Sequence, residues 1–155
     1  MLKDIWHTSF TVSNLEKSLD FYCNILGFEV VHRQEQANTY TSKFIGYENA
    51  HLKVAMLKLP NQQTGVSGHT LELIEYVHPK GPNVDVSTCN AGSAHMAFVV
   101  DDMAKTYTHF KRKGVRFKSE PVLIEEGRNK GGYAVYFLDP DNITLELVQP
   151  PMLHK

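Results

Sequence analysis

Hydrophobic and polar residues alternate along residues 7–12 and then change to a helical spacing, which predicts a strand followed by a helix. Asn14 and its neighbour Ser13 can accept hydrogen bonds from the free N–H groups of a first helical turn, and Gly27 can end the helix. We therefore expect a helix over about residues 15–26. The apolar side chains that define its buried face are Leu15, Leu19, Tyr22 and Leu26.

The same arrangement occurs a second time when His7 is placed over His95. Residues 95–100 form another β-prone run, the pair Asp101-Asp102 follows it, and Gly114 closes a second helical pattern. This second pattern predicts a helix over about residues 103–113. The chain therefore contains an internal repeat, and a repeat constrains the architecture of the whole fold.

Each half also ends on the same phrase, Leu71-Glu72-Leu73 in the first and Leu145-Glu146-Leu147 in the second. Further β-prone runs precede these phrases at residues 54–59 and 133–138. The coarse pattern is β-α-β-β-β, twice, so we predict an α+β fold of two tandem βαβββ modules. We expect one structural domain with a first module over residues 1–78, a linker over 79–93 and a second module over 94–155. Segments rich in Gly, Pro and Asn predict loops at residues 60–68 and 78–93.

Composition narrows the possible partners and the location. The 155 residues include 16 basic and 17 acidic side chains, a net charge of −1, without a run of Lys and Arg suited to phosphates, so nucleic acid is not an expected partner. No segment approaches the roughly 18 apolar residues of a membrane span, and the N-terminus is too polar for a signal peptide. We therefore expect a cytoplasmic protein without membrane contact. Cys23 and Cys89 lack CxxC spacing and are interpreted as ordinary thiols.

Strand alternation places the candidate metal ligands on one face of each sheet. His7 faces away from Phe10, which we expect in the core together with Trp6, and Glu72 faces away from the leucines beside it. A carboxylate in the middle of a strand is costly to bury unless it is paired or bound to a cation. Any single strand His or Glu is more often a surface or hydrogen-bonded residue, but repeat register favours a metal site. The predicted ligands are His7, Glu72, His95 and Glu146. Two imidazoles and two carboxylates suit Ni, Zn, Co, Mn or Fe(II).

At these residues the sequence resembles the vicinal-oxygen-chelate superfamily. Its members include glyoxalase I (lactoylglutathione lyase), methylmalonyl-CoA epimerase, extradiol dioxygenases and fosfomycin or bleomycin resistance proteins. The resemblance spans about residues 5–149, and its matching phrases beyond the ligand strands are LDFY at 19–22, LGF at 26–28, GSAH at 92–95 and FLDPD at 137–141. It implies sheets that curl into a cup around one divalent metal, with the four residues above at its ligand positions. Asn142 departs from the Gly usual after the Asp-Pro-Asp turn, but Asn also tolerates the left-handed conformation.

The His, Glu, His, Glu set is most similar to that of glyoxalase I. The resemblance implies chelation of substrate oxygens by the metal, with a Glu ligand that loosens to move a proton between adjacent carbons. Glu146 is the first candidate for this catalytic role and Glu72 the second, whereas Glu75 lies on the opposite face and is interpreted as a structural or surface charge. The leading hypothesis is a metal-dependent lyase or isomerase acting on a small carbonyl compound or its thiol adduct.

Three alternatives remain open at this point. They are an acyl-thioester epimerase, an Fe(II) extradiol-type dioxygenase and a drug-binding resistance protein. Family epimerases commonly carry Gln in place of the first Glu, and extradiol dioxygenases use two His and one Glu. The resemblance also implies a homodimer, although the cup can be completed within one chain or between two. The loop over residues 125–132 carries cations that can close over an anionic substrate, or it is an ordinary hairpin loop.

Overall fold

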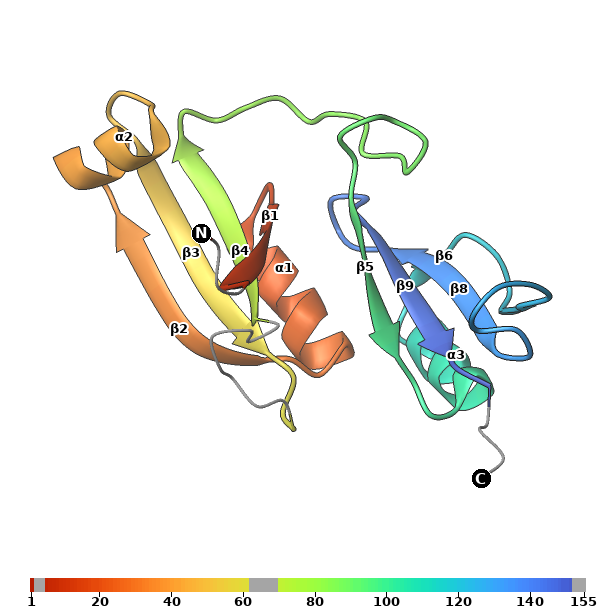
Figure 1. Ribbon diagram of the computed structural model, residues 1–155. Helices are drawn as coiled ribbons and strands as arrows, with labels where there is room; N and C mark the ends of the chain where they lie inside the picture. The colour runs from red at the N-terminus through yellow and green to blue at the C-terminus, as the bar shows by residue number, and fades with distance from the viewer. Residues whose placement is uncertain (2–4, 62–69, 152–155) are drawn as a thin grey trace. The chain divides into compact units, whose positions relative to one another are not determined.

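The structure, a computed structural model, describes residues 1, 5–61 and 70–151. The chain divides into two units, residues 1–83 and 84–155, and each unit consists of one sheet with helices (Figure 1). The first unit contains β1 His7–Thr11, α1 Leu15–Leu19, η1 Asp20–Ile25, β2 Glu29–Gln36, α2 Thr39–Ile45, β3 His51–Lys58 and β4 Thr70–His78. The second contains β5 His95–Val99, α3 Met103–Arg112, β6 Arg116–Phe117, β7 Val122–Leu123, β8 Tyr133–Leu138 and β9 Thr144–Gln149. The predicted α+β class with two βαβββ modules is confirmed.

The two sheets have the same topology at their core. The first is four-stranded in the order β1-β4-β3-β2, and the second is five-stranded in the order β5-β9-β8-β6, with β7 pairing β8. In each sheet the first strand runs parallel to the last strand of its own module, and the other pairs are antiparallel. The internal repeat seen in the sequence is therefore a repeat of strand pairing as well.

The predicted helices begin where the capping residues indicate. Asn14 accepts a hydrogen bond from the Lys17 N–H at 2.9 Å, and Asp102 accepts one from the Lys105 N–H at 2.9 Å. The helical segment that starts at Leu15 changes from α1 to the wider π-helical turn of η1 before it ends. Gly27 and Gly114 follow the two helices with φ of 84° and 82°, as their positions after the helices require.

The core lies between the helices and the inner face of each sheet. The leucines that flank Glu72 and Glu146 are fully buried, because strand alternation turns them toward the helices. Phe10 is buried as expected. The prediction for Trp6 is wrong: this side chain is 69% exposed, because it precedes β1 and so lies outside the strand that packs on the helix.

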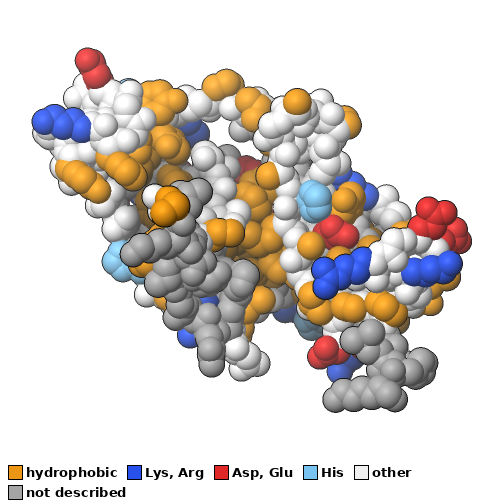
Figure 2. Space-filling view, in the orientation of Figure 1, with side chains coloured by type: hydrophobic (Ala, Val, Ile, Leu, Met, Phe, Trp, Pro, Cys, Tyr) orange, Lys and Arg blue, Asp and Glu red, His pale blue; other side chains and the backbone are white. Residues whose placement is uncertain are grey.

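The segment between residues 33 and 50 contains a helix that the sequence pattern did not predict. Strand β2 extends to Gln36, and helix α2 follows it, capped by the Asn38 side chain and ended by Gly46 at φ 79°. Tyr40 and Phe44 on this helix stack at 5.9 Å and are exposed, and Figure 2 shows hydrophobic side chains on the surface over α2. The low helix propensity of this β-branched and aromatic sequence explains why the pattern did not indicate a helix here.

The predicted loop at residues 78–93 is observed from Pro79 onward as a segment without helix or strand. Most of the predicted loop at 60–68 lies outside the described residues. None of the helices in the described part of the chain is long and apolar enough to cross a membrane.

Candidate metal site

The first unit brings together two of the four predicted ligands. His7 begins β1 and Glu72 lies on the adjacent strand β4, opposite Ser9. The Nε2 atom of His7 lies 3.2 Å from Oε2 of Glu72, and the carboxylate side chain is only 15% exposed. The buried Nδ1 atom of His7 has no hydrogen-bond partner within the described residues. The hydrogen-bonding capacity of this imidazole is therefore only partly used.

The second unit brings together the other two. His95 begins β5, Glu146 lies on β9 opposite Ala97, and Nε2 of His95 is 3.3 Å from Oε2 of Glu146. The Glu146 side chain is 18% exposed. The ring of Tyr136, which lies opposite Glu146 on β8, packs on the His95 ring at 5.4 Å. In the first unit Met56 occupies the position opposite the glutamate, so this aromatic contact is specific to the second unit.

The two pairs are equivalent in register as well as in residue type. In each unit the histidine is the first residue of the first strand, and the glutamate lies opposite the residue two positions further along that strand. Such a diagonal arrangement aims both side chains to one face, because residues two apart in a strand share a face. Two His–Glu pairs of the same construction are thus present, one in each unit, and each pair is a candidate half-site.

The spacing of each His–Glu pair is compatible with two neighbouring ligands of a divalent metal. Adjacent N and O ligands at about 2.1 Å from a metal lie about 3.0 Å apart at right angles and about 3.4 Å apart in a tetrahedron. The separations of 3.2 Å and 3.3 Å between Nε2 and Oε2 in the two pairs fall between these limits. A direct charge-assisted N–H to carboxylate hydrogen bond is shorter, about 2.7–2.9 Å. Each pair therefore has the donor atoms and the spacing of two neighbouring metal ligands.

Within either unit, the described residues do not gather a third His, Cys, Asp or Glu side chain into a metal-binding group. Each unit by itself offers two donors. Metal ions of this class generally require three or four protein ligands, so neither half-site is sufficient alone.

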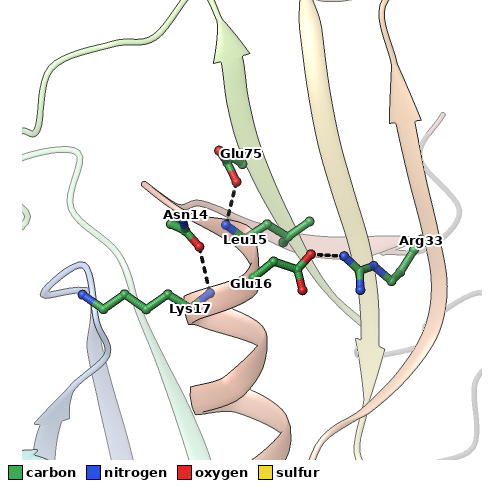
Figure 3. A network of polar contacts seen from close by, with 6 residues as sticks. All are labelled: Asn14, Leu15, Glu16, Lys17, Arg33 and Glu75. Atoms are coloured by element: carbon green, nitrogen blue, oxygen red, sulfur yellow. Dashed lines mark hydrogen bonds and ion pairs between the residues drawn. The ribbon is translucent and has the colours of Figure 1, made fainter.

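Glu75 has the structural role predicted for it. Three residues after Glu72 on β4, it faces the helix, and its Oε2 atom accepts a hydrogen bond from the Leu15 N–H at 2.7 Å (Figure 3). This carboxylate satisfies the first free N–H of α1, while Asn14 satisfies another. Gln149 does the same in the second unit, where its Oε1 atom accepts from the Met103 N–H at 2.6 Å.

The turn before β9 fixes the position of the second glutamate. The carboxylate of Asp139 accepts hydrogen bonds from the backbone N–H groups of Asp141 and Ile143 at 2.9 Å and 2.8 Å. Asn142 takes the left-handed conformation at φ 68°, as expected for the residue that replaces glycine. The turn therefore has the conformation that the sequence predicts.

The other candidates of the sequence have simpler explanations. The loop over residues 125–132 joins β7 to β8 and is closed by backbone hydrogen bonds, including Gly131 N–H to Ile124 O at 2.8 Å. A Cβ atom on Gly132 would meet the backbone oxygen of Gln149 at 2.3 Å, so the loop must pass close to β9. Arg33 forms an ion pair with Glu16 on the surface (Figure 3).

Histidines outside the repeat register lie at the surface where they are described, and His51 pairs with Glu35 at 2.6 Å. His69 and His154 lie outside the described residues. Cys23 and Cys89 are free thiols, as expected. Burial raises the pKa of the Cys23 thiol.

The comparison with known protein families agrees with this fold. Residues 4–147 match the model of the Glyoxalase/Bleomycin resistance protein/Dioxygenase superfamily. The chain belongs to this superfamily.

Individual relatives carry two kinds of name. The chain is 31% identical over 148 residues to a lactoylglutathione lyase of Neisseria meningitidis, covering 92% of this chain and 88% of the relative. It is 26% identical over 151 residues to a 2-epi-5-epi-valiolone epimerase of Actinomyces sp., covering 95% and 79%. These names support an enzyme of the superfamily.

Solved structures support the fold. A glyoxalase family protein from Bacillus cereus is similar with a TM-score of 0.76 and 16% identity, covering 97% of this chain and 96% of that protein. A glyoxalase I from Leishmania major is similar with a TM-score of 0.64 and 18% identity, covering 96% and 87%. At these identities the similarity concerns the fold.

Proposed function

We propose that this protein is a divalent-metal-dependent lyase or isomerase of the glyoxalase type. In this proposal His7, Glu72, His95 and Glu146 bind one transition metal ion, which is Ni, Zn, Co, Mn or Fe. The single observation that carries the proposal is the pair of equivalent half-sites, with N to O distances of 3.2 Å and 3.3 Å. Membership of the superfamily and the relatives named lactoylglutathione lyase support it.

The metal, when bound, supplies Lewis acidity that stabilises negative charge on two neighbouring substrate oxygens. The protein's own contribution is proton transfer. Oε2 of Glu146 takes a proton from one carbon of the substrate and returns it to the next, and Glu72 is the alternative base. Both carboxylates are mostly buried but still accessible, which suits a base that must exclude water and reach a substrate.

An epimerase is the second candidate, and a specific observation favours it. The relative named 2-epi-5-epi-valiolone epimerase aligns with nearly the whole chain. Epimerisation and isomerisation both require removal and return of a proton beside a polarised carbonyl, so one site can serve either reaction. An acyl-thioester epimerase belongs to the same candidate class. A dioxygenase or a drug-binding protein does not require two His and two Glu, and both are therefore secondary.

The substrate in this proposal is a small carbonyl compound or its thiol adduct. We further propose that the protein forms a homodimer. The two half-sites of one metal centre come either from the same chain or from the two chains of the dimer. Sedimentation of the purified protein, with and without metal, tests the dimer directly.

Elemental analysis of protein purified without chelator or affinity metal tests the metal site. The wild-type protein is expected to hold about one equivalent of metal per chain, and the double variant His7→Ala, Glu146→Ala is expected to lose it. The matched control is the double variant His51→Ala, Glu35→Ala, which removes an exposed His–Glu pair outside the repeat register. A wild-type protein that binds no metal after reconstitution, or a control that loses metal equally, would contradict the proposal.

A further inference from the structure

The second unit contains a cavity of about 330 Å³ on the face that carries Glu146. Thr144 lines it, and Thr144 shares a face with Glu146 because the two residues are two apart in β9. Leu138 on β8 lies opposite Thr144 and lines the cavity too. The full lining is Val84, Asp85, Val86, Ser87, Lys118, Leu138, Asn142 and Thr144.

The lining of this cavity includes the cationic side chain of Lys118. The Nζ atom of Lys118 lies 5.7 Å from the centroid of the Tyr136 ring, and the centroid of the His95 ring lies 5.4 Å from that of the same tyrosine. Among the described residues, no carboxylate lies within ion-pair distance of Lys118. The ammonium group is therefore available to an anion in the cavity, and Tyr136 connects it to the metal half-site.

A buried hydroxyl, that of Thr144, belongs to the lining of the same cavity. Thr144 is fully buried, and its Oγ1 atom has no hydrogen-bond partner in the described structure. The equivalent residue of the first unit, Thr70, donates its hydroxyl to the carbonyl oxygen of Trp6 at 3.1 Å. A buried hydroxyl without a partner is unfavourable, so its retention next to a cavity points to a ligand that accepts the hydrogen bond.

Asp85, a third polar residue of the lining, limits the charge of that ligand. Asp85 accepts a hydrogen bond from the Ser87 N–H at 2.9 Å, and hydrogen bonding with Ser87 lowers the pKa of the Asp85 carboxyl. This carboxylate is engaged within its own loop and stays negative. Because the lining already carries this negative charge, a second charge on the ligand would be repelled more strongly, which favours a singly charged ligand over a doubly charged phosphate.

We propose that this cavity binds a carboxylate group of a small substrate, which pairs with the ammonium of Lys118 and accepts a hydrogen bond from Thr144. The apolar side chains of the lining then contact the carbon atoms next to the carboxylate. The assignment of this carboxylate to the substrate of the metal centre rests on the proposed function. The preference of the cavity for a carboxylate does not, because it depends only on residues of the second unit.

The test uses propionate and its neutral analogue propionamide as probes on the full chain, with and without bound metal. Amide resonances of Thr144 and Leu138 in NMR spectra are followed during titration. Propionate is expected to shift them saturably, while propionamide and inorganic phosphate bind at least about fivefold more weakly.

Two variants with a matched control assign the effect to its residues. Lys118→Met is expected to weaken propionate binding about fivefold or more. Thr144→Val is expected to weaken it about three- to tenfold, without loss of folding stability, because it removes an unpartnered hydroxyl. Lys111→Met is the control, since Lys111 also lies over a tyrosine ring, at 5.2 Å from Tyr107, but on helix α3.

Equal binding of propionate and propionamide, tighter binding of phosphate, or full binding by Lys118→Met would overturn the carboxylate site. Metal content, measured on the same samples, separates this result from the proposed function. Carboxylate binding by a protein that takes up no metal contradicts only the metal centre, and metal uptake without carboxylate binding contradicts only the cavity site.

Discussion

Glu75 allows the structural and the functional glutamates of one strand to be separated by experiment. It lies three residues after Glu72 on β4, on the opposite face, and accepts a hydrogen bond from the Leu15 N–H at 2.7 Å. The substitution Glu75→Ala removes this acceptor and leaves a partly buried N–H at the start of α1 without a partner. The bond from Lys17 N–H to Asn14 remains, so the helix keeps one of its two side-chain caps.

The expected loss of stability follows from these contacts. Removal of a side-chain cap costs about 0.5–2 kcal/mol, and a negative charge at a helix N-terminus adds about 0.3–1 kcal/mol. Because a second cap remains, we expect Glu75→Ala to lower the free energy of unfolding by about 1–2 kcal/mol. Glu75→Gln keeps the acceptor and loses only the charge, so its expected cost is below about 1 kcal/mol. Gln149 already performs this role with an amide oxygen in the second unit.

Urea unfolding followed by circular dichroism measures both variants, and elemental analysis of the same samples measures bound metal. Both variants are expected to keep the metal content of the wild-type protein, because the side chain faces the helix rather than Glu72. A stability of Glu75→Ala within about 0.3 kcal/mol of wild type would refute the capping argument. Loss of metal from Glu75→Gln would refute the assignment of faces.

Three further outcomes test other parts of the structure. Gly132→Ala is expected to destabilise the protein by about 1–3 kcal/mol in the same urea assay, because the added Cβ would lie 2.3 Å from a backbone oxygen; unchanged stability would contradict this close approach. Exposed Cys89 is expected to react with a thiol reagent at neutral pH before Cys23, whose pKa is raised by burial, and mass spectrometry of partly labelled protein identifies the first site. Hydrogen bonds with Ser87 lower the pKa of Asp85, so its contribution to stability is present above about pH 4 and is lost as the pH falls through the lowered pKa. The stability difference between wild type and Asp85→Ala should therefore shrink on acidification, and a difference that grows below pH 4 would contradict that sign.

Most of the fold could be predicted because the sequence contains an internal repeat. Strand alternation has a period of two, so the position of a single residue such as Glu72 fixes the face of every other residue in its strand. The buried leucines and the assignment of Glu75 to the helix side both follow from this rule, and the two helix starts follow from the capping residues Asn14 and Asp102. The pairing of each histidine with a glutamate also follows, because equivalent positions in a repeat occupy equivalent positions in space.

Features specific to one half could not be predicted in the same way. Helix α2 has no counterpart in the second half, and its β-branched and aromatic residues have low helix propensity. Its only local signals are Asn38 before the helix and Gly46 after it, which fit a cap and a helix end. Lys118 and Thr144 were missed for a related reason. Neither residue type is unusual in a strand, and only the cavity shows that they stand together.

These differences between the halves also favour Glu146 over Glu72 as the base. The sequence makes the two glutamates equivalent, but the described structure places a cavity on the face of Glu146, lined by Lys118 and by a threonine whose hydroxyl has no hydrogen-bond partner among the described residues. A substrate carboxylate held there would place the reacting carbons on the side of the second half-site. Glu146→Gln is therefore expected to reduce proton exchange between substrate and deuterated solvent about a hundredfold or more, and Glu72→Gln much less. Both amides can still ligate a metal through oxygen, so metal content measured alongside separates loss of the base from loss of the ion. An equal or larger loss of exchange in Glu72→Gln would show that the asymmetry of the cavity does not select the base.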